Sequence, residues 1–251
     1  MQLIDNPKGN YRFLTGIAPY SAGVTAMPGY EIVRVTLQTP MPYKQAFALI
    51  DRHFQAENRP RQALCAVELR LPKPLTFAGF AEFNQGYRAL LAEWDLLLGE
   101  YNPVARTNIA PAVHPPPEPA LYAFSYTTPC ADDKQSTFIV AGAGDLRDQA
   151  DLSNAAVVRP GETSAHALRE KAACVMQVMQ ERLTGLQMKW AQATAVDIYT
   201  AQPLHAVLLS EIFSVMGEAT THGVHWYYSY PPIADLIFEM DLRGVRQELR
   251  V

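Results

Sequence analysis

The sequence predicts an α+β fold made of mixed β-sheets, with helices on one face of each sheet, in two similar halves. Segments that are rich in β-branched residues and alternate between apolar and polar are interleaved with segments of helical periodicity. The element order of the first half returns in the second. A chain of 251 residues that is 49% hydrophobic can bury the cores of two small domains.

The first half is predicted to contain four strands and two helices after a polar N-terminal segment. Residues 30–38 (YEIVRVTLQ) alternate as a strand does, and Pro40 and Pro42 are expected to end it. Residues 43–57 carry apolar side chains at helical spacing, which predicts an amphipathic helix. The remaining elements are a strand, a long helix and two strands, at residues 63–71, 79–98, 105–113 and 120–126.

The second half repeats this order. Residues 137–141 form a predicted strand, and residues 165–186 a long helix for which Ser164 is the expected N-cap. The following elements are a strand, a helix and two strands, at residues 191–199, 204–216, 224–230 and 236–242. The boundary falls within residues 127–135, so the predicted domains are residues 1–128 and 129–251.

A sheet with both helices on one face must cover its other face. We therefore expect the two halves to pack against each other, or one chain against another.

Composition excludes several classes of protein. The net charge of −4, without a run of Lys or Arg, argues against nucleic acid as a partner. No segment approaches a membrane span, and the N-terminus lacks an apolar signal region, so we expect a cytoplasmic protein that does not bind membranes. Cys65, Cys130 and Cys174 are odd in number and far apart, which predicts reduced thiols.

No cofactor or metal is expected. The segment GAGDLRD, from Gly142 onward, lacks the third glycine and the helix start of a dinucleotide-binding motif. His222 and His225 form an HxxH pair, but an offset of three along a strand directs two side chains to opposite faces. A shared metal is therefore not predicted.

Several short segments, in order, resemble the Rid (YjgF/YER057c/UK114) family. They are GIAPYSAGV with the later QTP, the helical FAEFNQGYRALL and the strand NPVARTNIAP in the first half. FIVAGAGDL, GVHWYYSYPP and DLIFEMDLRG match more loosely in the second half. The resemblance implies two tandem Rid-like, chorismate-mutase-like domains, a homo-oligomer with a trimer favoured, and ligand pockets between domains.

The resemblance also implies an activity and a site. The family hydrolyses imines and enamines to 2-oxo acids and ammonia, so we expect a hydrolase or deaminase acting on a small carboxylate-bearing metabolite. Arg106 would hold the substrate carboxylate through two parallel hydrogen bonds. The expected substrate-binding residues are Arg106, Tyr20, Thr36, Leu37, Asn84 and Asn108.

The acid of the family's pattern is missing from the first half, because residues 121–126 (LYAFSY) contain none. Glu118 lies in the proline-rich connector HPPPEP, and Glu239 lies in the matching strand of the second half, about two residues out of register by sequence alone. Catalytic residues are therefore left unassigned. Two alternatives stay open, namely a non-catalytic ligand-binding or assembly protein, and an enzyme resembling the chorismatases that acts on a cyclic carboxylate.

Overall fold

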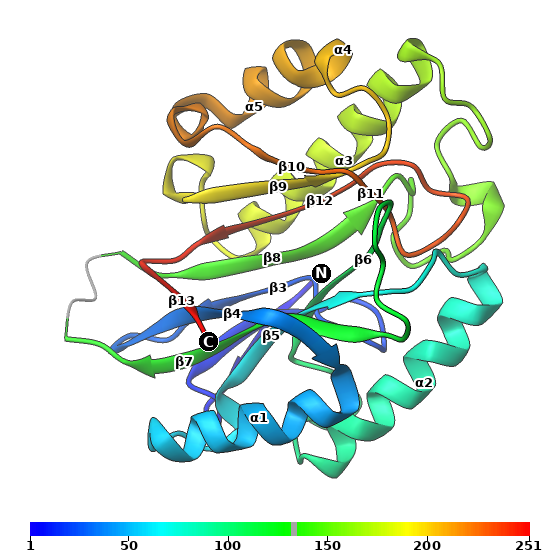
Figure 1. The fold of residues 1–251 in the computed structure, drawn as a ribbon. Helices are drawn as coiled ribbons and strands as arrows, with labels where there is room; N and C mark the ends of the chain where they lie inside the picture. Colours follow the sequence, from blue (N-terminus) through cyan, green and yellow to red (C-terminus); the bar gives the residue numbers. More distant parts are fainter. Residues whose placement is uncertain (132–134) are drawn as a thin grey trace.

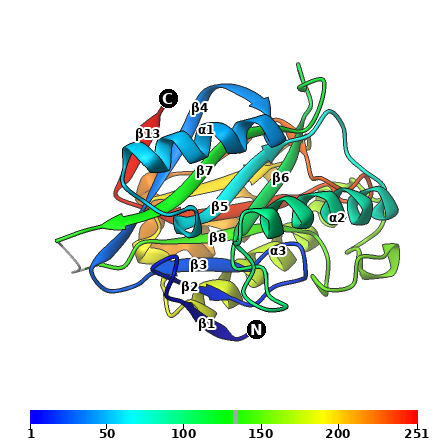
Figure 2. The same cartoon turned by 90° about the horizontal axis from the view of Figure 1, so that it is seen from below.

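The computed structural model describes residues 1–131 and 135–251 and arranges them in four layers. Two mixed sheets pack face to face, and helices cover the outer face of each sheet (Figures 1 and 2). The predicted α+β class with mixed sheets is confirmed. Each sheet combines antiparallel pairs with at least one parallel pair, β5 with β6 in one and β9 with β10 in the other.

The six-stranded sheet has the order β11-β6-β5-β7-β4-β13. Helices α1 (Tyr43–Ala56) and α2 (Phe77–Glu93) cover its outer face (Figure 2). They bury the apolar stripes that the sequence predicted. Its strands are β4 (Tyr30–Pro42), β5 (Leu64–Arg70), β6 (Ala105–Pro111), β7 (Ala120–Pro129), β11 (Ser229–Tyr230) and β13 (Gln247–Arg250).

The seven-stranded sheet has the order β1-β2-β3-β8-β12-β9-β10. Its strands are β1 (Leu3–Asn6), β2 (Tyr11–Leu14), β3 (Gly23–Ala26), β8 (Phe138–Gly144), β9 (Ala195–Tyr199), β10 (His225–Tyr227) and β12 (Glu239–Gly244). The long helix α3 (Ala165–Gly185) packs on its outer face, and the Ser164 hydroxyl caps this helix as predicted.

The second helical region is less regular than predicted. It consists of α4 (His205–Val207), a π-helical turn (Leu208–Phe213) and α5 (Ser214–Met216). Short 3₁₀ turns lie at Arg61–Ala63, Asn154–Ala156, Trp190–Gln192 and Gly217–His222. Among the helices of the described residues, none combines the length and apolarity needed to cross a membrane.

Several predicted elements have different bounds, and four of the differences are informative. Strand β4 continues through both prolines to Pro42, with an irregularity between Thr36 and Met41. Proline lacks an N–H donor and is tolerated here because the neighbouring β13 is short and pairs only with residues 33–36 of β4. Helix α2 ends at Glu93 rather than at residue 98. Strand β9 begins at residue 195, after a 3₁₀ turn. The predicted strand 224–230 is divided between β10 and β11, which belong to different sheets.

Each sheet contains strands from both sides of the predicted boundary between residues 128 and 129. The N-terminal segment, expected to be a polar leader, forms β1, β2 and β3 of the seven-stranded sheet, while the C-terminal β13 pairs with β4. Residues 132–134 of the expected inter-domain segment lie outside the described residues.

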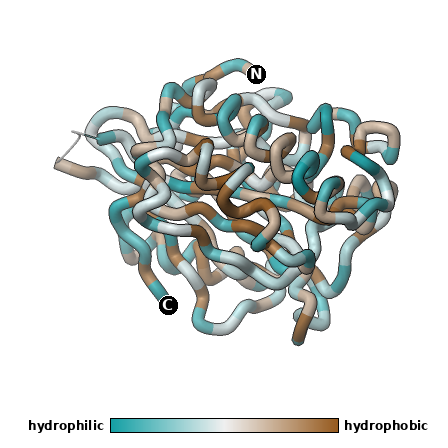
Figure 3. The backbone as a smooth tube through the Cα atoms, turned by 90° about the horizontal axis from the view of Figure 1, so that it is seen from above, coloured by the Kyte–Doolittle hydropathy of each residue, from teal (hydrophilic) through white to brown (hydrophobic). Residues whose placement is uncertain are grey.

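The two sheets cover each other's inner faces, as expected for sheets that carry their helices on one face only. Apolar residues fill one part of this interface, where Ile32 and Cys65 of one sheet meet Phe13 and Val24 of the other. The most hydrophobic segments accordingly run through the middle of the molecule (Figure 3). Charged side chains occupy another part of the interface.

Candidate functional site

Arg106 is buried in a box of aromatic rings. It lies on β6, where strand alternation turns its side chain toward α2, and only 3% of the residue is exposed. Its guanidinium carbon lies 4.8 Å from the ring centroid of Tyr20 and 4.6 Å from that of Tyr87, and 5.6 Å from those of Phe80 and Phe83. Burial lowers the pKa of this guanidinium.

The polar groups around Arg106 are only partly satisfied. Its Nη2 donates to Asn84 Oδ1 at 2.5 Å, but its Nη1 finds no hydrogen-bond partner among the described residues. The same holds for the hydroxyl of Tyr87 and for both amide atoms of Asn108, which lies two residues further along β6. Buried polar groups normally have partners, so this cluster is arranged for a polar ligand.

Arg182 is a second buried guanidinium close to this cluster. It projects from the apolar face of α3, is 3% exposed, and donates from Nη1 to the carbonyls of Ala141 and Gly142 at 2.8 and 3.1 Å. Its Nε has no hydrogen-bond partner among the described residues. Within the described part of the chain, neither Arg182 nor Arg106 forms an ion pair with a carboxylate.

Glu239 supplies an acid near both arginines. It begins β12, is 4% exposed, and no described residue donates a hydrogen bond to its carboxyl group. Burial, followed by the nearby Asp241, raises its pKa well above the usual value, although Arg182 and Arg106 oppose this. The raised pKa favours the protonated form of Glu239, which can give a proton to a ligand.

Gly142 makes room for the Glu239 carboxyl group. A Cβ at this position would lie 2.5 Å from Glu239 Oε1 and 3.2 Å from the Thr107 Cα. The absence of a side chain therefore lets β8 pass close to both β6 and β12. This contact brings the acid of one sheet toward the arginine of the other.

Tyr20 joins these groups to the surface. Burial raises the pKa of its hydroxyl, while Arg106 and Arg182 lower it and Glu239 raises it further, so all three ionisable groups lie within electrostatic range of this phenol. A pocket of about 260 Å³ is lined by Tyr20 and Arg182, together with Gly16, Ile17 and Gln149. Tyr20 thus stands between an open pocket and the buried Arg106.

The structure brings together four of the six residues that the resemblance selected, namely Arg106, Tyr20, Asn84 and Asn108. Thr36 and Leu37 lie elsewhere. The Thr36 hydroxyl accepts from Arg34 at 2.8 Å between the sheets, whereas Leu37 is buried beneath α1, because successive residues of a strand point to opposite faces.

Two functional candidates were missed or left unassigned by sequence reasoning, although each has a local signal. Arg182 lies in the apolar stripe of α3, one turn after Met179. Glu239 opens the run EMDLR, in which charged residues alternate with apolar ones as on a strand whose charged face is buried. Neither signal indicates which site the residue joins.

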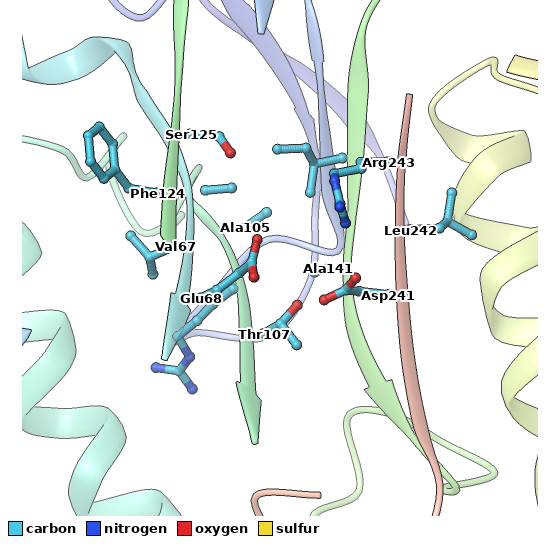
Figure 4. A pocket seen from close by; sticks show the side chains of 13 residues that line it. Val67, Glu68, Ala105, Thr107, Phe124, Ser125, Ala141, Asp241, Leu242 and Arg243 are labelled. Atoms are coloured by element: carbon cyan, nitrogen blue, oxygen red, sulfur yellow. The ribbon is translucent and has the colours of Figure 1, made fainter. Parts of the chain in front are cut away.

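A second charged cluster lies between the sheets, and its arginines Arg34 and Arg243 are both paired with carboxylates. Glu68 of β5 and Asp241 of β12 point toward each other, with Thr107 and Arg243 beside them (Figure 4). Arg34 binds Glu68 through two hydrogen bonds of 2.6 and 2.8 Å. The cavity at this point measures only about 10 Å³, so the cluster is packed and leaves no room for a substrate.

Arg243 and His225 both contact Asp197 at the far end of this cluster. Arg243 Nη1 lies 2.7 Å from Asp197 Oδ2, and His225 Nδ1 lies 2.8 Å from Asp197 Oδ1. Across residues 1–131 and 135–251, no group of three or more His, Cys, Asp or Glu side chains is placed to hold a metal ion.

The first cluster has the groups needed to bind an anion and transfer a proton. It consists of Arg106, Arg182, Tyr20 and Glu239. Two buried guanidiniums without carboxylate partners favour a ligand with negative charge. A neighbouring acid with a raised pKa can act as a general acid at neutral pH.

Two solved structures are similar in fold to most of this chain. A chorismatase matches 89% of this chain and 77% of its own, at 12% identity and a TM-score of 0.49. A cyanuric acid hydrolase matches 88% of this chain and 69% of its own, at 10% identity and a TM-score of 0.43. Likeness at this level assigns no activity.

Sequence similarity is more informative. A 2-amino-5-chloromuconate deaminase of Comamonas testosteroni is 37% identical over 241 residues, which cover 96% of this chain and 95% of the relative. The family model that matches residues 3–249 is described as 2-aminomuconate deaminase CnbZ. The assignment to the Rid family was therefore wrong, because its short motifs covered isolated segments, whereas this match spans nearly the whole chain. The chain belongs to the 2-aminomuconate deaminase CnbZ family.

Proposed function

We propose that this protein is a deaminase that hydrolyses 2-aminomuconate or a close derivative, a six-carbon unsaturated dicarboxylate with an amino group beside one carboxylate. The observation that carries the proposal is the pair of buried arginines, Arg106 and Arg182, that have no carboxylate partner in the described chain. The names of the family and of the relative from Comamonas testosteroni support the substrate class.

The two arginines match the two carboxylates of such a substrate. A buried guanidinium binds a carboxylate strongly through charge-assisted hydrogen bonds. Arg106 Nη1 and Arg182 Nε are the donors left for it. The flat conjugated chain between the carboxylates would lie along the ring of Tyr20, which faces the Arg106 guanidinium at 4.8 Å.

Glu239 would move the protons. Its protonated carboxyl group gives a proton to a carbon of the enamine, which converts the enamine into an iminium ion. Water then adds to the iminium carbon and returns a proton to Glu239, which yields a carbinolamine. A third transfer, from Glu239 to the nitrogen, allows the C–N bond to break while the hydroxyl becomes the new carbonyl. The proton lost from that hydroxyl passes to the departing ammonia, because ammonia is a stronger base than a carboxylate. The products are a 2-oxo acid and ammonium.

The test is turnover of 2-aminomuconate by the purified protein, followed by ammonium release and by loss of substrate absorbance. Glu239→Gln is expected to lower kcat by about 10²- to 10⁴-fold, which is the usual contribution of a general acid. Arg106→Gln and Arg182→Gln are each expected to lower kcat/KM by about 10- to 100-fold, since each removes a hydrogen bond to a charged group.

Arg61→Gln is the matched control, because this exposed arginine pairs with Asp51 at the surface. It should leave both kinetic constants unchanged. Absence of ammonium release by the wild-type protein would refute the proposal. Full activity in both Arg106→Gln and Arg182→Gln would refute the assignment of the site.

A further inference from the structure

The proposed reaction leaves Glu239 without its proton after every cycle. The net reaction consumes one proton in addition to those of water, and the departing ammonium carries it away. Glu239 supplied this proton, so its carboxyl group must be reprotonated from solvent. Glu239 is 4% exposed, and no described residue donates a hydrogen bond to it. A path for protons between this residue and the surface is therefore needed, and this inference rests on the proposed function.

A row of hydrogen-bonding side chains begins next to Glu239 and ends at the surface. Asp241 lies two residues along β12, so both carboxyl groups project from the same face of the strand. Burial, with the charges of Asp197 and Glu68 next, raises the pKa of Asp241 to about 7. Asp241 can therefore both hold and release a proton near neutral pH.

The next links are a tyrosine hydroxyl and an aspartate. The hydroxyl of Tyr199 donates to Asp241 Oδ2 at 3.0 Å and lies 3.5 Å from Asp197 Oδ2, so one hydroxyl is shared by two carboxylates. Strand alternation on β9 places Asp197 and Tyr199 on the inner face. A hydroxyl between two carboxylates can accept a proton from one and give its own to the other.

His225 ends the row in an open groove. Its Nδ1 contacts Asp197 Oδ1 at 2.8 Å, while 57% of its side chain is exposed. The groove measures about 590 Å³ and is walled by Tyr122, Trp226 and Arg250. The ring nitrogen that does not contact Asp197 is therefore available to solvent and buffer.

We propose that His225, Asp197, Tyr199 and Asp241 form a proton relay that reprotonates Glu239 from solvent. His225 takes a proton from solvent at Nε2 and passes its Nδ1 proton to Asp197. Tyr199 accepts that proton while giving its own hydroxyl proton to Asp241. Asp241 then passes its proton to Glu239 and returns to the carboxylate form. One proton enters and one arrives, and His225 is left with its proton on Nε2 instead of Nδ1. The exposed imidazole regains the Nδ1 proton by exchange with solvent before the next cycle.

The last step, from Asp241 to Glu239, crosses a short polar region. Thr107 lines the cavity of about 10 Å³ with Asp241, and its side chain also lies 3.0 Å from the position of a Cβ on Gly142, beside the Glu239 carboxyl group. A space of this size holds about one water molecule next to Asp241. The two carboxyl groups lie on one face of β12, and the charge of Asp241 raises the pKa of Glu239, so they are close enough to interact.

The test compares the first turnover with later ones in His225→Ala, using 2-aminomuconate in a weak buffer. The first turnover uses the proton already on Glu239, so we expect His225→Ala to form its first product molecule per chain at the wild-type rate. Later turnovers should be slower by about tenfold or more, as for loss of an acid–base group. Added imidazole enters the groove and should restore the steady-state rate in a saturable manner.

His222→Ala is the matched control, since this exposed histidine lies three residues away and has no contact with Asp197. It should show wild-type kinetics and no response to imidazole. Tyr199→Phe should reproduce the burst of His225→Ala but should not respond to imidazole, because the interruption lies deeper in the row.

Equal slowing of the first and later turnovers in His225→Ala, or no rescue by imidazole, would overturn the relay. If the wild type releases ammonium and Glu239→Gln does not, such a result removes the relay and leaves the proposed function intact. An inactive wild type would remove both.

Discussion

The buried arginines of this protein fall into two groups that differ in their partners. Arg34 and Arg243 lie between the sheets, and each pairs with two carboxylates. Arg106 and Arg182 are as deeply buried but have no such partner within residues 1–131 and 135–251. A buried charge that the fold does not neutralise is costly, so it is retained where a ligand neutralises it. Pairing therefore separates the structural cluster from the candidate site.

The largest expected effect on stability is in the paired group. Arg34→Met should lower the free energy of unfolding by about 3–5 kcal/mol, because it leaves the buried Glu68 without its bidentate partner. Chemical denaturation measures this change. The double variant Arg34→Met/Glu68→Gln should recover part of the loss, since it also removes the orphaned charge. A single variant as stable as the wild type would contradict the structural role of the pair.

Asp241 gives a pH-dependent effect of intermediate size. Because its pKa is raised from 3.8 to about 7, its contribution to stability is present at acid pH and is lost as pH rises through about 7. Asp241→Asn has no such loss, so its stability relative to wild type should increase between pH 5 and pH 8, by on the order of 2–4 kcal/mol. Melting curves at several pH values measure the difference. A difference that stays constant with pH would show that Asp241 titrates normally.

Local patterns predicted most helices and central strands, because alternation and helical periodicity are written into neighbouring residues. The run YEIVRVTLQ became part of β4, and the helix after Ser164 begins where its cap predicted. The polar N-terminal segment was not recognised as three strands. Its strands are only four residues long, and they join the rest of the sheet only where β3 pairs with β8, which lies far away along the chain.

The site was half predictable for the same reason. Arg106 and Asn84 were found through segments that resemble a known pattern, and they do form a hydrogen bond. Arg182 and Glu239 come from the other half of the chain and reach the site only because the sheets pack face to face at Gly142. No local pattern encodes that packing, which is why Glu239 was seen but not placed, and why the whole-chain match corrected the family.

Ligand binding should sharpen the contrast between the two groups. The dicarboxylate cis,cis-muconate lacks the amino group and cannot be deaminated, so it should bind at Arg106 and Arg182 without turnover. At a concentration of about 100 times its Kd it should stabilise the wild type by about 2.7 kcal/mol, which a thermal shift measures. Arg182→Gln should lose most of this stabilisation, whereas Arg250→Gln, in the groove beside His225, should keep it. Equal stabilisation of both variants would place the ligand elsewhere.

The smallest expected change is the most discriminating one. Arg106→Met should alter the free energy of unfolding by only about 1 kcal/mol, because a buried charge without an ion-pair partner is replaced by an apolar chain that suits a box of aromatic rings. The loss of the hydrogen bond to Asn84 offsets part of the gain. Deaminase activity should nevertheless be lost. Denaturation and turnover measured on the same preparation test both halves of this expectation. Destabilisation as large as that of Arg34→Met would mean that Arg106 holds the fold together, and the distinction between paired and unpaired arginines would then fail.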